Sequence, residues 1–236
     1  MILFQDYHDF MPSRKDIFTN GSFYHIFNKT IDHRLIFEND KISKLFLNLL
    51  RYYRSTKSVI RYSHFNELQR ETRIRIEKQL IIPAHFKIEI LTFCLMPNHF
   101  HLLLKQKKAE GIIRYISDTI NSLTRFFNIL HERKGPIFLP QFRSRQIHTR
   151  EELIHVSRYH HLNPFSAGIV KNLKDILSYP YFSFNEYSKA GLTNLCNTDY
   201  ILKEFSFDKN KYQQFVFSNA EHQKMLQSVK YVKKWL

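Results

Sequence analysis

Glycine and cysteine are both scarce in this chain, and their scarcity excludes several kinds of protein. Only 5 of the 236 residues are Gly, and neither a Gly-x-Gly-x-x-Gly nor a Walker sequence occurs, so we expect no glycine-rich phosphate-binding loop. The 2 cysteines, Cys94 and Cys196, are too few and too far apart for a disulfide framework or a zinc finger. We expect both to be free thiols in a reducing cytoplasm.

Long apolar runs are lacking as well. No stretch reaches about 18 apolar residues, so we expect no transmembrane helix and no membrane partner. Residues 1–10 have neither the basic start nor the apolar core of a signal peptide, which again favours the cytoplasm. The chain can still bury a core, because 43% of its residues are hydrophobic and 15% are aromatic.

Acidic residues are outnumbered by basic ones. Lys and Arg together number 36 against 21 Asp and Glu, which gives a formal net charge of +15. The excess is spread along the chain rather than held in one tail. A folded protein this basic typically binds a polyanion, usually nucleic acid, although charge alone defines no site and a merely soluble basic protein is the alternative.

Four segments have the composition of β-strands or extended arms. Aromatic and aliphatic side chains dominate the first three, and a Pro-Asn pair predicts a turn between the second and the third. The fourth segment contains a pair of arginines. The segments are residues 22–28, 86–95, 99–105 and 137–149.

Apolar residues at helical spacing predict helices over residues 39–57 and 109–132, the first of them capped by Asn39 or Asp40. A third helix is expected to begin at the N-cap Thr149 and to end at about residue 162, because Pro164 lacks an amide hydrogen and disfavours helix at the preceding residue.

This order of elements is typical of an α+β fold, in which a small antiparallel sheet is covered on one face by helices. Two further segments stand apart from the expected sheet and helices. Residues 60–82 are strongly charged and are expected to form an exposed helical or loop excursion. Residues 191–236 are polar and are expected to be a partly helical tail.

The most informative stretch is the hydrophobic run 91–104, where two histidines flank one bulky apolar residue. Alternate side chains of a strand share a face, so His99 and His101 should lie side by side while Phe100 points into the opposite layer. Two imidazoles on a rigid strand provide half of a metal site. The alternative is a pair of histidines facing solvent or a polar core, since a His-x-His match often arises by chance.

A second segment places Tyr159 and Asn163 four residues apart, on one face of the third helix. A tyrosine hydroxyl with its ordinary pKa of about 10 is a poor nucleophile and needs a phosphate that a cation has polarised. An Asn oxygen can add one ligand to the two histidines and leave positions open for phosphate and water. The alternative is that Tyr159 packs the helix and Asn163 caps its end.

Five stretches of the chain, spread over about residues 20–190, together carry a family resemblance. They are Tyr24-His25-Ile26-Phe27-Asn28, Arg34-x-Ile36-Phe37, Met96-Pro97-Asn98-His99-Phe100-His101-Leu102-Leu103, Phe142-Arg143-Ser144-Arg145 and Tyr159-x-x-Leu162-Asn163-Pro164-x-x-Ala167-Gly168. Each is modest alone, but the ordered set resembles the REP-associated tyrosine transposases, which are single-tyrosine HUH endonucleases of the insertion-sequence type.

The resemblance implies a ferredoxin-like fold, with a catalytic domain over residues 1–190 and a helical extension over residues 191–236. It also implies a Mg²⁺- or Mn²⁺-dependent cut of single-stranded or hairpin DNA. A tyrosine attacks a phosphodiester, keeps the 5′ phosphate and frees a 3′ hydroxyl. The protein is expected to act as a monomer or a homodimer.

By the same resemblance, His99 and His101 correspond to the metal-binding histidines, Tyr159 to the nucleophile and Asn163 to a third metal ligand carried by a helix. Related transposases often have Gln in place of this Asn. Asparagine is shorter than glutamine, so its reach to the metal is the part of the site that the resemblance specifies least.

Further positively charged or titratable residues surround these four. Arg143, Arg145 and Arg158 are expected to contact DNA phosphates, the alternative being ordinary solvated charges. His160 follows the expected nucleophile directly and could act as an extra base or ligand. A packed or solvated histidine is the simpler interpretation of that residue.

Three functions remain open from the sequence. The leading hypothesis is a DNA-strand-transferring endonuclease, and the second is a sequence-specific DNA hairpin-binding protein without catalysis. The third, an RNA-binding ferredoxin-like module, explains the basic charge but not the combination of two histidines, a tyrosine and an asparagine. The presence of all four side chains favours the enzyme.

Overall fold

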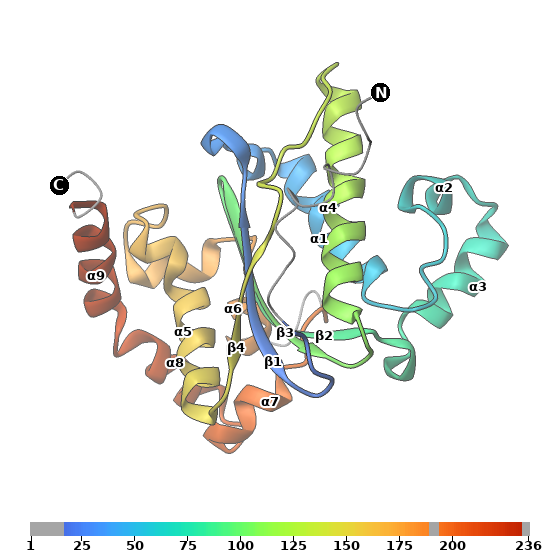
Figure 1. Cartoon of the computed structure of the whole chain (residues 1–236). Coiled ribbons are helices and arrows are strands. Elements are labelled where there is room, and N and C mark those ends of the chain that lie inside the picture. Colours follow the sequence, from blue (N-terminus) through green and yellow to red (C-terminus); the bar gives the residue numbers. More distant parts are fainter. Residues whose placement is uncertain (1–16, 189–193, 233–236) are drawn as a thin grey trace, which may run out of the picture.

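A four-stranded antiparallel sheet lies at the centre of the protein, which we describe from a computed structural model over residues 17–188 and 194–232 (Figure 1). The strands follow the spatial order β2-β3-β1-β4. Two helices connect the strands, one between β1 and β2 and one between β3 and β4, so the chain forms a β-α-β-β-α-β unit. The expected ferredoxin-like α+β fold is confirmed. The strands are β1 (Phe23–Lys29), β2 (Ile88–Met96), β3 (His99–Gln106) and β4 (Arg143–Ile147).

The hairpin of β2 and β3 turns at Pro97-Asn98, as expected from the sequence. Met96 and His99 are the first paired residues after the turn, and the pairing continues along both strands to Ile88 and Gln106. Strand β1 pairs with the free side of β3. The central strand β3 is therefore hydrogen-bonded on both edges, which makes it a rigid platform for side chains.

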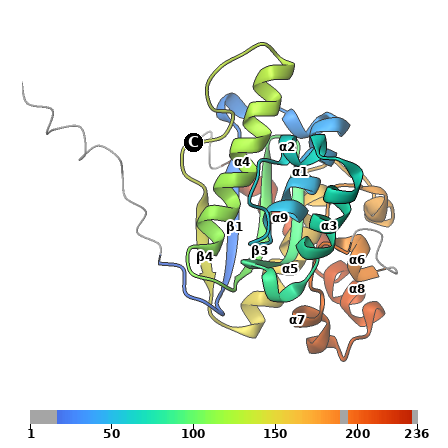
Figure 2. The same ribbon diagram turned by 90° about the vertical axis from the view of Figure 1, so that its right-hand side faces the viewer.

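Helices α1 (Asp40–Tyr53) and α4 (Gly111–Leu130) cover one face of the sheet, which Figure 2 shows from their side. They match the helices expected over 39–57 and 109–132. Asn39 caps α1, because its side chain accepts the amide hydrogens of Lys41 and Ile42. The apolar stripes of both helices pack on strand residues such as Phe100, so this face forms a continuous hydrophobic core.

The opposite face of the sheet is covered too, by α5 (Arg150–Ser166) and helices that follow it (Figure 1). The sequence predicted helices on one face only, since a polar tail gives little sign of where it packs. Buried Leu103 of β3 and Leu162 of α5 belong to this second hydrophobic cluster. The sheet is thus the middle layer of three.

The third helix continues past the end that we predicted for it. Thr149 is its N-cap, as expected, but α5 runs through Pro164 to Ser166. Proline inside a helix costs about 3 kcal/mol, here because the carbonyl of His160 loses its amide partner. Leu162 and Phe165 are 0% and 2% exposed. Burying two such side chains contributes roughly 1.5–3 kcal/mol each, which offsets the proline.

The remaining elements are short and lie around these layers. The charged excursion is helical and mostly exposed, as expected for residues 60–82. The described part of the tail is also helical, and its helices α8 and α9 pack against α5. The elements are α2 (Tyr62–Glu67), α3 (Arg70–Leu80), α6 (Phe184–Ser188), α7 (Asp199–Leu202), α8 (Lys209–Phe217), α9 (Ala220–Val232) and the 3-10 turns η1 (Ile31–His33), η2 (Ile36–Glu38), η3 (Pro83–His85), η4 (Leu173–Ser178) and η5 (Lys203–Phe205).

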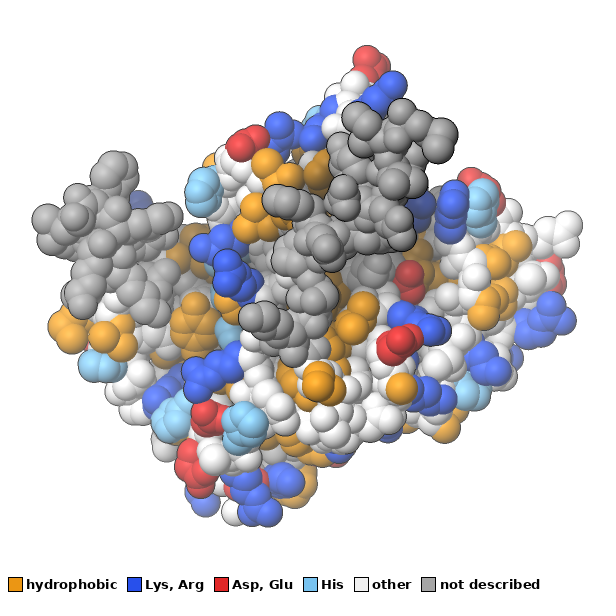
Figure 3. Space-filling view, viewed as in Figure 1, with side chains coloured by type: hydrophobic (Ala, Val, Ile, Leu, Met, Phe, Trp, Pro, Cys, Tyr) orange, Lys and Arg blue, Asp and Glu red, His pale blue; other side chains and the backbone are white. Residues whose placement is uncertain are grey.

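Several further expectations concern the surface and the termini. Both Cys94 and Cys196 are free thiols. None of the helices in the described ranges combines the length and the hydrophobicity that a bilayer crossing requires. Lys and Arg side chains are distributed over the visible face rather than gathered in one patch (Figure 3). Residues 1–10, in which we expect no signal peptide, lie outside the described residues.

A substitution at Gly111, the first residue of α4, tests how tightly this helix packs against the chain that leads into β2. A Cβ added at Gly111 would lie 2.4 Å from the carbonyl oxygen of Lys87, which already accepts the amide hydrogens of Lys107 and Lys108. We expect Gly111→Ala to lower the free energy of unfolding by about 1 to 2 kcal/mol, because overpacking outweighs the helix preference of Ala. Urea unfolding measures this. Asn121→Ala, at an exposed position of the same helix, is the control and should change it by less than about 0.5 kcal/mol.

Candidate active site

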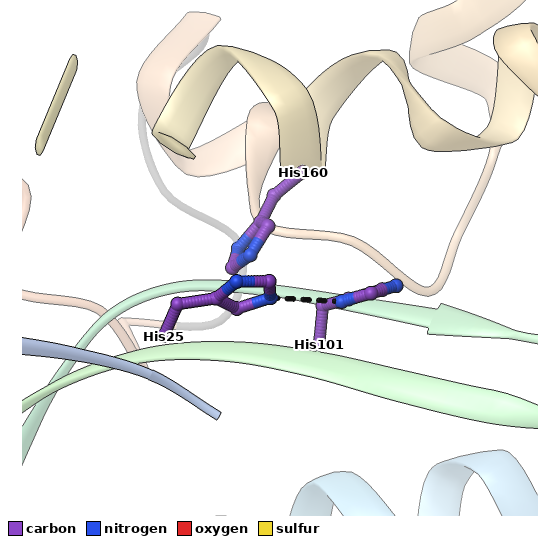
Figure 4. Close-up of side chains that lie close together, drawn as sticks. All are labelled: His25, His101 and His160. Carbon is purple, nitrogen blue, oxygen red and sulfur yellow. Dashed lines mark hydrogen bonds between the residues drawn. The ribbon is translucent and has the colours of Figure 1, made fainter. Parts of the chain in front are cut away.

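Three histidines from separate elements meet between the sheet and α5. They are His25 of β1, His101 of β3 and His160 of α5, and one nitrogen of each lies within 4.8 Å of the others (Figure 4). The register explains the first two. His25 pairs with Leu103, so His101 is its diagonal neighbour on the same face of the sheet. The helix α5 brings His160 onto this pair from above.

A hydrogen bond holds one nitrogen of each of the three rings. His25 Nε2 and His101 Nδ1 are 2.9 Å apart, and His160 Nδ1 is 2.7 Å from the hydroxyl of Thr92. The Nε2 atoms of His101 and His160 are buried and have no hydrogen-bond partner among the described residues. In Figure 4, the second nitrogen of His101 points away from the other two rings. The unpartnered Nε2 of His101 therefore lies on the side of the ring that faces away from His25.

Burial keeps these rings neutral. It lowers the pKa of His25 and of His99 to about 4, with Arg145 adding to the effect on His25. The pKa values of His101 and His160 lie well below the usual 6.5, first because of burial and then because of the neighbouring imidazoles. A neutral imidazole has one lone pair available for a cation.

His99 and His101 share a face, as the alternation predicted, while Phe100 packs on the opposite face against Phe46. The two histidine rings are 5.0 Å apart. His99 Nδ1 lies 2.7 Å from the side-chain oxygen of Asn98, which accepts its hydrogen and leaves Nε2 with the lone pair. Both histidines therefore use Nδ1 for a hydrogen bond.

Tyr159 and Asn163 lie one turn apart on α5, as predicted. The half-buried ring of Tyr159 is 5.5 Å from that of His101 and almost perpendicular to it. Asn163 is 3% exposed, and its Nδ2 has no partner in the part of the chain that the structure describes. Because α5 continues to Ser166, Asn163 does not cap the helix end.

One group of side chains among the described residues could hold a metal ion, and it consists of the imidazoles of His25, His101 and His160. The predicted donor set of His99, His101 and Asn163 shares only His101 with that group, and Nδ2 of Asn163 is buried without a hydrogen-bond partner among the described residues. The two ends of an amide have nearly the same shape, so a half-turn places Oδ1 where Nδ2 lies. Imidazole nitrogens and an amide oxygen suit Mn²⁺ and Mg²⁺ when positions remain open for water and phosphate.

The three predicted arginines fall into two groups. Arg143 and Arg145 are exposed on the edge strand β4, and they pair with Phe27 and His25 of β1, so they lie on the face of the histidines. Arg145 also forms an ion pair of 2.8 Å with Glu152. Arg158 is oriented differently, because it stacks on Phe215 of α8 at 4.4 Å and bonds to His155 of its own helix.

Two residues of the cluster were not among the predicted ligands. His25 occurs in a stretch that carried the family resemblance, and only the pairing of β1 with β3 reveals its place beside His101. His160 is packed, as we favoured, but it packs inside the site rather than against an ordinary core. An imidazole at an alternating position of a predicted strand is the signal that could have identified His25.

Comparisons with known proteins support the fold. No family model and no curated protein matches the chain. Among solved structures, the chain is similar to a REP-associated tyrosine transposase bound to a REP hairpin, with a TM-score of 0.51 and 13% identity over 75% of this chain and 84% of that chain. At this identity the likeness shows the fold alone.

Direct binding of Mn²⁺ tests the donor set. At about 100 times its Kd, the ion should stabilise the folded protein by about 2.7 kcal/mol, because it binds the native state only. We expect His99→Ala and His101→Ala to lose this stabilisation, measured by thermal unfolding with and without Mn²⁺. Exposed His148 lies outside the cluster, and His148→Ala should keep the full effect. Unchanged stabilisation in both site variants would contradict the assignment.

Proposed function

We propose that this chain is a metal-dependent endonuclease and strand transferase of the single-tyrosine HUH type, acting on single-stranded or hairpin DNA. One observation carries the proposal: the ring of Tyr159 lies 5.5 Å from that of His101, which has His99 beside it on the same strand. A nucleophile needs this proximity to a cation site in order to attack a phosphate. The fold neighbour, a tyrosine transposase bound to a DNA hairpin, supports the same reaction and substrate class.

His99, His101 and Asn163 are the residues that we assign to a Mg²⁺ or Mn²⁺ ion. The bound cation polarises the scissile phosphate and stabilises negative charge that develops on its oxygens. The protein side chains fix where the phosphate can lie. The rings of His99 and His101 are each held at Nδ1, so their Nε2 atoms on β3 would hold the cation, with Asn163 contributed by α5.

The proposed reaction exchanges one phosphodiester for another. The oxygen of Tyr159 forms a bond to phosphorus, and the bond from phosphorus to the 3′ oxygen of the preceding nucleotide breaks. The phenol loses its proton and the departing 3′ oxygen gains one. The products are a 5′-phosphotyrosine and a free 3′ hydroxyl, which can later reverse the step or join another strand.

DNA contacts are assigned to the arginines. Arg143 and Arg145 lie on the histidine face of β4, where they can hold the phosphates that flank the cut. Arg158 is next to the nucleophile in sequence, and its stacking on Phe215 gives it a fixed direction. The net charge of +15 adds a general attraction for nucleic acid.

Removal of one oxygen tests the nucleophile. We expect Tyr159→Phe to abolish the covalent protein–DNA band that forms with labelled hairpin DNA and Mn²⁺, while hairpin binding persists, because the ring remains. Electrophoresis under denaturing conditions measures the adduct. Tyr181→Phe is the matched control: its hydroxyl bonds to Asp40 of α1, the helix on the other face of the sheet, and the adduct should form normally.

Two results would argue against this assignment. Cleavage that survives Tyr159→Phe would mean that metal-bound water is the nucleophile. Tight hairpin binding by the wild-type protein, with neither adduct nor cleavage in Mn²⁺, would support the alternative of a binding protein without catalysis.

The salt dependence of binding tests the arginines. Each phosphate contact releases counterions, so Arg143→Ala and Arg145→Ala should weaken hairpin binding and each reduce the slope of log K against log salt by about 1. Arg125→Ala, exposed on α4 of the other layer, should leave the slope unchanged. Fluorescence anisotropy at several salt concentrations measures both quantities. An equal change in the salt slope for all three variants would mean that overall positive charge, and not contacts of Arg143 and Arg145 with particular phosphates, drives binding.

A further inference from the structure

We infer that His25 is a positioning residue: its Nε2 accepts the Nδ1 hydrogen of His101 and thereby directs the Nε2 lone pair of His101 toward the cation. This inference rests on the proposed function, since it concerns the same cation site. It adds a third imidazole to the site in a role that is distinct from ligation. The contact that carries it is the 2.9 Å separation of His25 Nε2 and His101 Nδ1.

Counting protons determines the direction of this hydrogen bond. A neutral imidazole carries one hydrogen, so His101 can ligate through Nε2 only if its hydrogen is on Nδ1. The sole polar contact of His101 Nδ1 among the described residues is His25 Nε2. That atom must therefore accept, which places the hydrogen of His25 on its own Nδ1. Metal-binding histidines commonly donate their other nitrogen in this way.

The surroundings of His25 hold it in the accepting role. The ring of His160 lies 4.8 Å from it and that of Phe27 lies 5.2 Å from it, so rotation of the imidazole is hindered on both sides. Arg145 stands opposite His25 across β1 and β4.

The geometry separates positioning from ligation. In Figure 4 the dashed contact joins His25 to the near nitrogen of His101, and the far nitrogen of His101 points the other way. The far nitrogen is the one that is buried without a partner among the described residues. A cation on that nitrogen lies on the side of His101 opposite to His25, so His25 acts on it through His101 and not by direct contact.

Substitutions at position 25 distinguish an acceptor from a ligand. His25→Leu keeps the size and removes the acceptor, and the affinity for Mn²⁺ should fall roughly 10- to 100-fold. His25→Gln restores an acceptor, because its Oε1 reaches about as far as His Nε2, and it should recover most of the affinity. Thr92→Val is the control: it removes the partner of His160 within the same cluster and should bind Mn²⁺ as the wild type does.

The experiment is a Mn²⁺ titration of the full-length proteins, followed by EPR, with thermal unfolding in EDTA to compare their stabilities. Pulsed EPR of the bound ion should count two coordinated imidazoles in both the wild type and His25→Gln. This comparison holds even if His25→Leu loses its fold. Wild-type affinity in His25→Leu, or affinity in His25→Gln as weak as in His25→Leu, would overturn the inference, and so would three coordinated imidazoles.

The outcome is separable from that of the proposed function. If the wild type binds no Mn²⁺, the cation site and this inference both fail. If Mn²⁺ binds through two imidazoles and its affinity does not depend on the residue at position 25, the inference fails and the proposed function stands. If the affinities follow the expected order but no covalent DNA adduct forms, the nuclease proposal fails and the role of His25 stands.

Discussion

The pairing of β1 with β3 is the constraint on which the rest of the site depends. Because side chains alternate across a strand, a shift of one residue would send His99 and His101 into the layer of α1 and α4. Hydrophobic residues on both sides prevent such a shift. Phe100 and Leu102 fill one layer while Leu103 fills the other, so each face of β3 has its own buried anchors. Packing in two layers thus fixes the direction of two imidazoles.

The helix that carries Tyr159, α5, is held by hydrogen bonds from the C-terminal helices α8 and α9. The buried hydroxyl of Tyr212 in α8 bonds to Ser157 and His161 of α5, and the side chain of Gln223 in α9 donates to the backbone carbonyl of Tyr159. Helices α8 and α9 both pack against α5. These contacts give the C-terminal helices a structural role, because they hold the helix that carries Tyr159, the proposed nucleophile.

Sequence reasoning recovers what local patterns determine. The alternation of β3, the stripes of α1 and α4 and the N-caps at Asn39 and Thr149 all follow from the identity of neighbouring residues. The end of α5 cannot be predicted from neighbouring residues. Distant segments bury Leu162 and Phe165, and this burial overrides the local effect of Pro164. The place of His25 also depends on a partner strand about seventy residues away, which no local pattern encodes.

The proposed reaction joins Tyr159 itself to DNA. Peptide mapping by mass spectrometry, after the wild-type protein reacts with hairpin DNA and Mn²⁺ and the DNA is digested, locates the attachment. We expect a nucleotide 5′-phosphate on the peptide that contains Tyr159. Attachment to another residue, such as Tyr181, would contradict the assigned nucleophile. A cut strand without any attached peptide would contradict tyrosine chemistry altogether.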